Sequence, residues 1–280
     1  MIKFDQAVKK YGNTRALNGV DLSITDNGIY CLLGRNGAGK TTLLKAMAGH
    51  IPLSSGEITI DGKKVDTLDM PDISFIESQG QFFNMRVRDL IAFSKKFSDN
   101  FDVEFANLMV QKFKLDTGKR YKQLSFGMKT MVAAILSLSG GNKIVVLDEP
   151  VLGFDAIMRD RFYTLIVESL ELRPRIIIVS THIIDEIARA VNKVIIIDKG
   201  KILEYFDITE IDEKAYSITG MTADIEKAAA GLNVTGKKSV GGFTTAFVFD
   251  KRIAPPAHCT VQAMSLQDYF VQLVGGDEHE

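Results

Sequence analysis

The chain has 280 residues, a formal net charge of −1 and 46% hydrophobic residues. This length and composition are typical of a globular protein with one or two domains and ample core. The near-zero charge provides no basic field, so nucleic acid is not an expected partner. No secretion signal is visible at the N-terminus, and no run approaches the roughly 18 apolar residues of a membrane span. We therefore expect a cytoplasmic chain whose two cysteines, Cys31 and Cys259, are reduced core residues.

Two short β-like runs, Ile2–Phe4 and Val20–Ile24, open the chain. A polar turn at residues 9–13 separates them and contains Tyr11. An aromatic ring just upstream of a phosphate loop can stack on a nucleotide base. On local evidence alone, a half-buried tyrosine in an edge loop is the simpler interpretation.

The strongest signal is the segment G-R-N-G-A-G-K-T-T at residues 34–42, which fits G-x-x-x-x-G-K-[ST]. A buried-strand sequence, Gly28–Leu33, precedes it and a helical sequence follows, which is the context of a phosphate-binding loop. Glycines let backbone N–H groups surround an anion, and the helix N-terminus attracts the same phosphates. We expect Lys40 to reach the β- and γ-phosphates and the Thr41 hydroxyl to bind Mg²⁺. The nucleotide-binding residues predicted from this segment are Gly34, Arg35, Asn36, Gly37, Ala38, Gly39, Lys40, Thr41 and Thr42.

The next stretch predicts strands and then a helical insertion. Glu57–Gly62 alternates and stops at Asp-Gly, a hairpin signal, and Asp72–Ile76 predicts another strand. From Val87 to Leu138 the periodicity is helical, which indicates a subdomain inserted between strands. The apolar positions expected on the buried helix faces are Leu90, Ile91, Phe93 and Phe97, and later Leu108, Met109 and Phe113.

Three continuous apolar runs, at residues 143–147, 175–180 and 193–197, predict strands buried on both faces of a parallel sheet. Helical segments at about 157–172 and 183–191 separate them, as βαβ crossovers require. Past residue 203 the pattern changes to short β-rich pieces and short helices, so residues 205–280 are expected to form a small α+β unit. Its expected strands are at 215–219, 243–249 and 259–264, and its expected helices at 222–231 and 265–274.

Two carboxylates end the first of these runs. Asp148 at the carboxyl end of a buried parallel strand, beside a phosphate loop, is placed to hold Mg²⁺. If the strand continues, Glu149 faces the other way, towards the γ-phosphate. Glu149 is then the expected general base that polarises an attacking water.

Residues 1–204 resemble the nucleotide-binding subunit of an ABC transporter, with these motifs in the family's order. The resemblance implies a P-loop NTPase cassette of the α/β class, with a mostly parallel sheet, an antiparallel β part and a helical subdomain at about 78–138. The small α+β domain at 205–280 follows. It further implies ATP and Mg²⁺ as cofactors and a dimer of ATPase chains, homo- or heteromeric, with two shared sites.

The family's signature motif has two candidates in this sequence. Leu124–Met128 stands at the head of a helical sequence, upstream of the Asp148 strand. Leu138–Asn142 is closer to the LSGGQ text, but it adjoins that strand and is better explained as a helix C-cap and turn. Phosphate recognition needs N–H groups at a helix N-terminus, so we choose Leu124–Met128. The resemblance then implies that Ser125 and Gly127 contact the γ-phosphate held by the opposite subunit.

The resemblance assigns the remaining motifs. Asp155 ends a D-loop that communicates across the dimer, and His182 is the switch histidine that bonds the γ-phosphate. Tyr11 becomes the aromatic that stacks on adenine. For the Q-loop metal ligand, direct alignment favours Glu77 or Ser78, whereas spacing from the phosphate loop favours Gln79, which we choose.

The resemblance implies an ATP-hydrolysing subunit that powers transport through a separate multi-span membrane permease, on the inner face of the cell membrane. Export is favoured by the altered signature and by residues 264–275, which are similar to the closing segment of exporter ATPases and form a helix capped by Ser265. Apolar Phe82, Phe83 and Met85 are expected either to contact the permease or to pack inside the helical subdomain. The alternative is a soluble ABC ATPase that acts on a macromolecule. Co-purification with a membrane protein separates the two.

Overall fold

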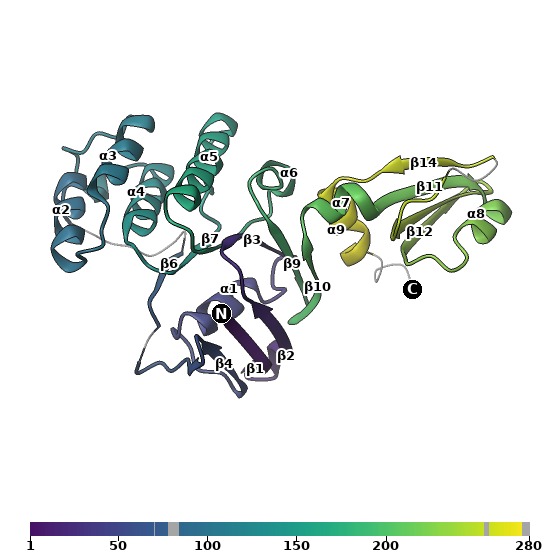
Figure 1. The fold of residues 1–280 in the computed structure, drawn as a ribbon, viewed down its shortest axis with the longest axis horizontal. Coiled ribbons are helices and arrows are strands. Elements are labelled where there is room, and N and C mark those ends of the chain that lie inside the picture. Colours follow the sequence, from purple (N-terminus) through teal and green to yellow (C-terminus); the bar gives the residue numbers. More distant parts are fainter. Residues whose placement is uncertain (70, 78–83, 255–257, 276–280) are drawn as a thin grey trace.

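The computed structural model describes residues 1–69, 71–77, 84–254 and 258–275 (Figure 1). At its centre is a six-stranded sheet in the order β10-β9-β3-β8-β7-β6. Strands β9, β3, β8, β7 and β6 are parallel, and β10 is antiparallel to β9. The strand bounds are β3 Gly28–Leu33, β6 Ile73–Glu77, β7 Ile144–Asp148, β8 Ile176–Ser180, β9 Lys193–Asp198 and β10 Lys201–Asp207. The predicted parallel sheet is confirmed.

The central strands are buried on both faces, as their apolar sequences predict. Every residue of β3, β7 and β8 is buried. On β3, Cys31 and Leu33 belong to the core formed with the helices, while Tyr30 and Leu32 belong to a second core formed with α1 and the N-terminal strands. Because successive strand residues point to opposite faces, this one strand anchors a layer on each side of the sheet.

The N-terminal strands form an antiparallel sheet in the order β2-β1-β4-β5. Its strands are β1 Ile2–Tyr11, β2 Thr14–Ile24, β4 Ser55–Ile60 and β5 Lys63–Lys64. The hairpin predicted at Asp61-Gly62 is confirmed. The predicted turn at residues 9–13 is wrong in extent, since β1 continues through Tyr11. Register shifts between Phe4 and Lys10 interrupt the alternation from which a strand is recognised in sequence.

The helices follow the predicted order. Helices α2, α3 and α4 lie together beside β6 at one end of the central sheet, and α5 and α6 follow β7 and β8 (Figure 1). Their bounds are α1 Lys40–Met47, α2 Val87–Phe97, α3 Val103–Lys112, α4 Phe126–Ser139, α5 Ala156–Leu172 and α6 Ile184–Ile187. The helix expected over 183–191 is shorter, since α6 ends at Ile187 with Ala188 as its C-cap. Further along, the Asn192 N–H donates to Ile29 O of β3 at 2.8 Å.

The predicted buried faces of α2 and α3 are only partly correct. Leu90 and Ile91 are buried, but Phe93 and Phe97 are 47% and 76% exposed and lie against each other with ring centroids 4.4 Å apart. The buried residues of α2 all lie in its first half. Periodicity therefore identifies the inward face but not the point at which packing ends. On α3, Met109 is buried as predicted, and so is Phe113 at the C-cap, whereas Leu108 is exposed.

The C-terminal segment forms an antiparallel sheet in the order β12-β13-β11-β14, at the far end of the molecule from α2 (Figure 1). Ile225 of helix α8 and Ala229, its C-cap, form a small core with residues of β11 and β13. Helix α9 contacts α6, and Leu266 and Tyr269 join the large core. Strand β12 is not predicted from the sequence, because its lysines hide its alternation. The bounds are α7 Thr209–Lys214, β11 Ala215–Met221, α8 Thr222–Ala228, β12 Val234–Val240, β13 Phe243–Phe249, β14 Thr260–Ala263 and α9 Leu266–Gly275.

The predicted cap of the last helix is confirmed, because Ser265 Oγ accepts a 3.1 Å hydrogen bond from Asp268 N. Across all the residues described above, no helix is long and apolar enough to cross a membrane.

Candidate functional site

The segment between β3 and α1 has the backbone of a phosphate-binding loop. Gly37 and Gly39 have φ angles of +81° and +111°, which favour glycine. A Cβ on Gly34 would lie 2.5 Å from Ile197 O, and one on Gly39 would lie 2.5 Å from Ala16 O. The loop is therefore held so closely against its neighbours that two of its glycines have no room for a side chain.

Lys40 lies inside this loop. Its side chain is buried, and Nζ donates to Gly34 O at 2.7 Å and to Arg35 O at 3.3 Å. An ammonium group has three N–H donors. A bound anion would thus meet a positive charge that the loop's own carbonyl groups already orient.

Asp148 joins three elements at the carboxyl edge of the sheet. The Thr41 hydroxyl of α1 donates to Asp148 Oδ2 at 2.7 Å, and the Ser180 hydroxyl of β8 donates to Asp148 Oδ1. Asp148 ends β7, Ser180 ends β8, and the two residues are in register. The carboxylate is buried, so its orientation is fixed by these two donors.

Glu149 has a left-handed backbone, with a φ of +52°. Glu149 is expected to face the other way only if the strand continues, and this condition is not met because β7 ends at Asp148. Instead, the Glu149 N–H donates to Ser180 O at 3.1 Å, and its Oε2 lies 2.9 Å from His182 Nδ1. A non-glycine residue in this conformation stores strain, which is commonly found at functional sites. The turn brings Glu149 and His182 together.

Ser180 is the residue of this cluster that the sequence reading missed. The signal is present in the sequence, since Ser180 ends the predicted run at 175–180 and Asp148 directly follows the run at 143–147. The carboxyl ends of neighbouring parallel strands meet at one edge of the sheet. On β3, burial raises the pKa of the Cys31 thiol, and the nearby Glu149 charge acts in the same direction. Cys31 is a buried free cysteine, as expected.

The proposed signature segment stands at a helix start. Ser125 is the N-cap of α4, and its Oγ accepts from Met128 N at 3.3 Å. Leu138–Asn142 lies at the other end of that helix, where Gly140 is the C-cap and Gly141 has a φ of +78°. The expected cap and turn are confirmed there, although Ser139 is still helical and fully buried. The signature role of Ser125 and Gly127 stays a prediction.

The other predicted residues lie at the start of α5, at the end of β1, in the loop before α1 and on α1. Asp155 is the N-cap of α5, and its Oδ1 accepts from Met158 N at 2.8 Å. Tyr11, the last residue of β1, is 51% exposed, and Lys9 Nζ lies 5.1 Å from its ring centroid. Asn36 and Gly37 are exposed in the loop, Ala38 is buried, and Thr42 is half-buried on α1.

Of the three Q-loop candidates, only Glu77 is among the described residues. It ends β6 in register with Asp148, and its Oε1 lies 2.6 Å from Lys45 Nζ on α1. Gln79, our choice, lies outside the described residues, as do Ser78, Phe82 and Phe83. Met85 is half-buried and packs against the large core, as in the core interpretation of this residue.

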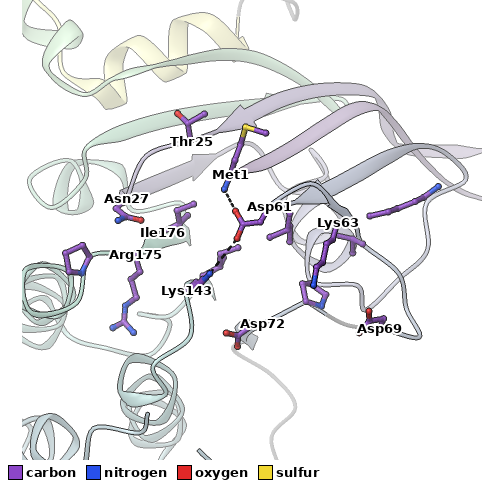
Figure 2. Close-up of a pocket in the computed structure, with 16 residues that line it drawn as sticks. Met1, Thr25, Asn27, Asp61, Lys63, Asp69, Asp72, Lys143, Arg175 and Ile176 are labelled. Atoms are coloured by element: carbon purple, nitrogen blue, oxygen red, sulfur yellow. Dashed lines mark hydrogen bonds and ion pairs between the residues drawn. The ribbon is translucent and has the colours of Figure 1, made fainter. Parts of the chain in front are cut away.

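A cavity of about 740 Å³ lies at the opposite edge of the sheet, where β7 and β8 begin at Ile144 and Ile176 (Figure 2). In its wall, Asp61 Oδ1 accepts a 2.7 Å hydrogen bond from the Met1 amino group, and Asp61 Oδ2 lies 3.9 Å from Lys143 Nζ (Figure 2). The phosphate loop follows the carboxyl end of β3 instead. This cavity is therefore separate from the Lys40–Asp148 group.

A glycine loop that leads into a helix, a buried lysine inside it and a hydroxyl–carboxylate pair at the sheet edge define a P-loop nucleotide-binding protein. Comparison with known proteins narrows this class. A sequence profile described as ABC transporter matches residues 17–152.

Three relatives illustrate the similarity. ABC transporter ATP-binding protein YtrB of Bacillus subtilis (strain 168) is 27% identical, over 89% of this chain and 86% of its own. Lantibiotic transport ATP-binding protein SrtF of Streptococcus pyogenes is 30% identical, over 72% of this chain and 89% of its own. Taurine import ATP-binding protein TauB of Escherichia coli (strain K12) is 28% identical, over 71% of this chain and 80% of its own.

A solved structure has the same fold. The dimeric post-hydrolysis state of the ATP-binding cassette MJ0796, bound to ADP and Pi, aligns with a TM-score of 0.65 and 20% identity, covering 74% of this chain and 99% of that one. The expected cassette fold is confirmed. The chain belongs to the ABC transporter ATP-binding proteins, and it is a transport ATPase subunit.

Proposed function

We propose that Lys40, Thr41, Asp148, Glu149 and His182 form one half of a hydrolytic ATP site, which a second ATPase chain completes. The observation that carries this proposal is the joint placement of two pairs at one sheet edge. Thr41 contacts Asp148 at 2.7 Å, and Glu149 contacts His182 at 2.9 Å. The first pair suits metal and phosphate binding, and the second suits proton handling.

The phosphate groups of ATP bind to the loop's N–H groups, the N-terminus of α1 and Lys40. The residues present also fit Mg²⁺, because a hydroxyl and a carboxylate oxygen are hard donors that already face each other. Among the described residues there is no cluster of three or more His, Cys, Asp or Glu side chains, and Mg²⁺ bound with a nucleotide needs none. Thr41 and Asp148 would hold the ion, with Gln79 as the proposed third protein ligand. The ion supplies charge neutralisation at the phosphates.

Hydrolysis needs a water oxygen to attack the γ-phosphorus while the bond to the β–γ bridging oxygen breaks and ADP leaves. Glu149 accepts the proton of that water, which makes it the general base. His182 holds the Glu149 carboxylate through Nδ1 in this structure, and in the closed state its N–H donates to the γ-phosphate instead. Tyr11, exposed at the end of β1, stacks on the adenine ring.

The second half of each site comes from Ser125, Gly127 and Asp155 of the other chain. The dimeric MJ0796 structure supports a two-chain site. Phe126, between Ser125 and Gly127, is 42% exposed, so the start of α4 is open to a partner. ATP closes the dimer and hydrolysis opens it, which transmits a movement to the membrane subunit.

The membrane partner is a multi-span permease, and the chain works on the inner face of the cell membrane through that partner. Family membership supports this partner. The exposed Phe93–Phe97 pair on α2 offers it an apolar surface. Export is our proposed direction, on the form of the signature and of the closing segment. Since SrtF and TauB are similarly close, overall identity does not decide direction.

The test is co-purification followed by transport. Tagged chain expressed in its source cell should capture a multi-span membrane protein, and the pair in vesicles should move substrate only with ATP on the side of this chain. Phe93→Asp is expected to weaken capture while ATP binding is kept, and Leu172→Asp, an exposed site at the end of α5, is the control. Capture of a ribosome or another soluble assembly without a membrane protein would favour the non-transport alternative.

A further inference from the structure

Arg159, near the start of α5, makes two hydrogen bonds to α6 and a third to the loop before α5. Its Nε and Nη2 donate to the two carboxylate oxygens of Glu186 at 2.6 and 2.8 Å, and its Nη1 donates to Phe154 O at 2.9 Å. The first two form the paired fork contact that a guanidinium makes with a carboxylate. The third holds the backbone of the residue just before Asp155. One side chain thus binds two segments that are far apart in the sequence.

One end of this link lies next to the hydrolytic pair. Glu186 is in α6, a single turn that begins two residues after His182. His182 Nδ1 contacts Glu149 Oε2 at 2.9 Å. A shift of α6 therefore moves the segment that carries His182.

The other end lies against the signature segment. Phe154 follows Gly153, and a Cβ on Gly127 would lie 2.9 Å from Gly153 O. A Cβ on Gly153 would lie 2.8 Å from the Phe126 ring. These close approaches show that the loop before α5 packs tightly against the start of α4. The loop that contains Phe154, which Arg159 holds, thus packs directly against the residues proposed to contact the other chain's nucleotide.

Stability alone gives a weak reason for this ion pair. The Arg159 and Glu186 side chains are 21% and 32% exposed, and partly exposed ion pairs add little to the free energy of unfolding. Helix α6 is already anchored by Ile184 and Ile187, which are buried in the large core. The ion pair adds directional hydrogen bonds, which apolar contacts lack. Through Arg159, these bonds fix α6 relative to the Phe154 carbonyl group in the loop before Asp155.

We propose that Arg159 is a positioning residue for ATP hydrolysis, which holds the Phe154–Asp155 backbone and the α6 segment behind His182 as one unit. The proposal rests on the hydrolytic site proposed above. The γ-phosphate side and the signature side of the subunit then move together when the dimer closes. The affinity for ATP does not depend on the Arg159 contacts.

The experiment compares purified full-length variants by ATP affinity, kcat, KM and Tm. Arg159→Lys keeps the charge, but one ammonium cannot supply the fork and the carbonyl contact together. We expect ATP affinity and Tm close to wild type and a kcat lower by about 10- to 100-fold, as for misplaced catalytic groups. Glu186→Gln should show a smaller loss of the same kind, and the double variant should lose no more than Arg159→Lys. Lys112→Met is the matched control. Lys112 of α3 contacts both carboxylate oxygens of Glu168, which lies on α5 as Arg159 does.

The outcomes separate this inference from the hydrolytic site. If Glu149→Gln abolishes turnover but Arg159→Lys keeps the wild-type kcat, the positioning role is overturned and the site stands. Equal losses in ATP affinity and kcat would also overturn it, since they indicate a binding defect. If Arg159→Lys does not fold, Glu186→Gln decides, and a folded Glu186→Gln variant with wild-type kcat overturns the proposal. If Glu149→Gln has no effect, the hydrolytic site itself is wrong.

Discussion

The Thr41 hydroxyl donates a 2.7 Å hydrogen bond to Asp148 Oδ2, which ties the first turn of α1 to the end of β7. These are the two described side chains proposed to hold Mg²⁺. Their contact means that the proposed ligands are already in place before nucleotide binds. Pre-positioned ligands reduce the ordering cost of binding.

The first prediction concerns Asp148→Asn, which keeps the shape of the side chain and removes its charge. We expect the gain in ATP affinity that Mg²⁺ provides to fall by roughly 10- to 100-fold, a loss typical of damaged metal sites. ATP affinity in EDTA should change little, because Lys40 and the loop are intact. Titration of ATP with and without Mg²⁺ measures both. An unchanged Mg²⁺ dependence would remove Asp148 from the metal site.

The second prediction compares two glycines of the loop. In Gly39→Ala the new Cβ meets Ala16 O at 2.5 Å at a φ of +111°, so the loop must shift. In Gly37→Ala, φ is +81° and nothing lies within 4 Å, so the cost is backbone strain alone, about 1–2 kcal/mol. Gly39→Ala should therefore lose both Tm and ATP binding, and Gly37→Ala should lose mainly some Tm. Equal effects in thermal unfolding would contradict the structural difference.

The third prediction tests the signature choice. Ser125→Arg adds bulk and charge at the open start of α4, and it should stop turnover while each chain still binds ATP. Ser139 is unsuitable as the comparison because it is fully buried, so a large residue there would disrupt the core. Asn142→Ala is the better control for the Leu138–Asn142 segment, because it adds no bulk and removes a 2.5 Å hydrogen bond from Asn142 Nδ2 to Asp72 Oδ1. Full activity in Ser125→Arg beside a folded, inactive Asn142→Ala would reverse the choice.

The fourth prediction concerns pH. Burial raises the pKa of the half-buried Glu204 carboxyl above its ordinary value. The folded chain then holds a proton that the unfolded chain has lost, so stability falls as pH rises from the unfolded pKa, about 4.3, through the folded pKa. Glu204→Gln removes this cost. Its Tm should exceed wild type at pH 7, and the difference should shrink towards pH 4. A constant difference across this range would mean that the charge is not the cause.

Much of this fold follows from its apolar patterns. The runs at residues 143–147 and 175–180 are long enough, and apolar enough at successive positions, to predict parallel strands that are buried on both faces. Short or irregular elements were harder. Strand β1 has register shifts, β12 carries lysines, and α6 is a single turn, so each lacks the regular periodicity on which prediction depends.

The residues of the candidate site also differ in how far the sequence predicts them. Lys40 and Thr41 were found because their spacing is a local motif. The orientation of Glu149 was not, because it comes from a left-handed residue held by Ser180 of a neighbouring strand. The link from Arg159 to Glu186 spans 27 residues and has no sequence signature, so it required the structure.

The general-base role of Glu149 is the central claim, and Glu149→Gln tests it most directly. The variant keeps the size of the side chain and loses the proton acceptor. We measure steady-state ATP hydrolysis together with molecular mass in the presence of MgATP, with the exposed Glu104→Gln as control. The account predicts a loss of turnover of roughly 10²–10⁴-fold with retained ATP binding and accumulation of an ATP-bound dimer. Hydrolysis by Glu149→Gln at the wild-type rate would contradict it.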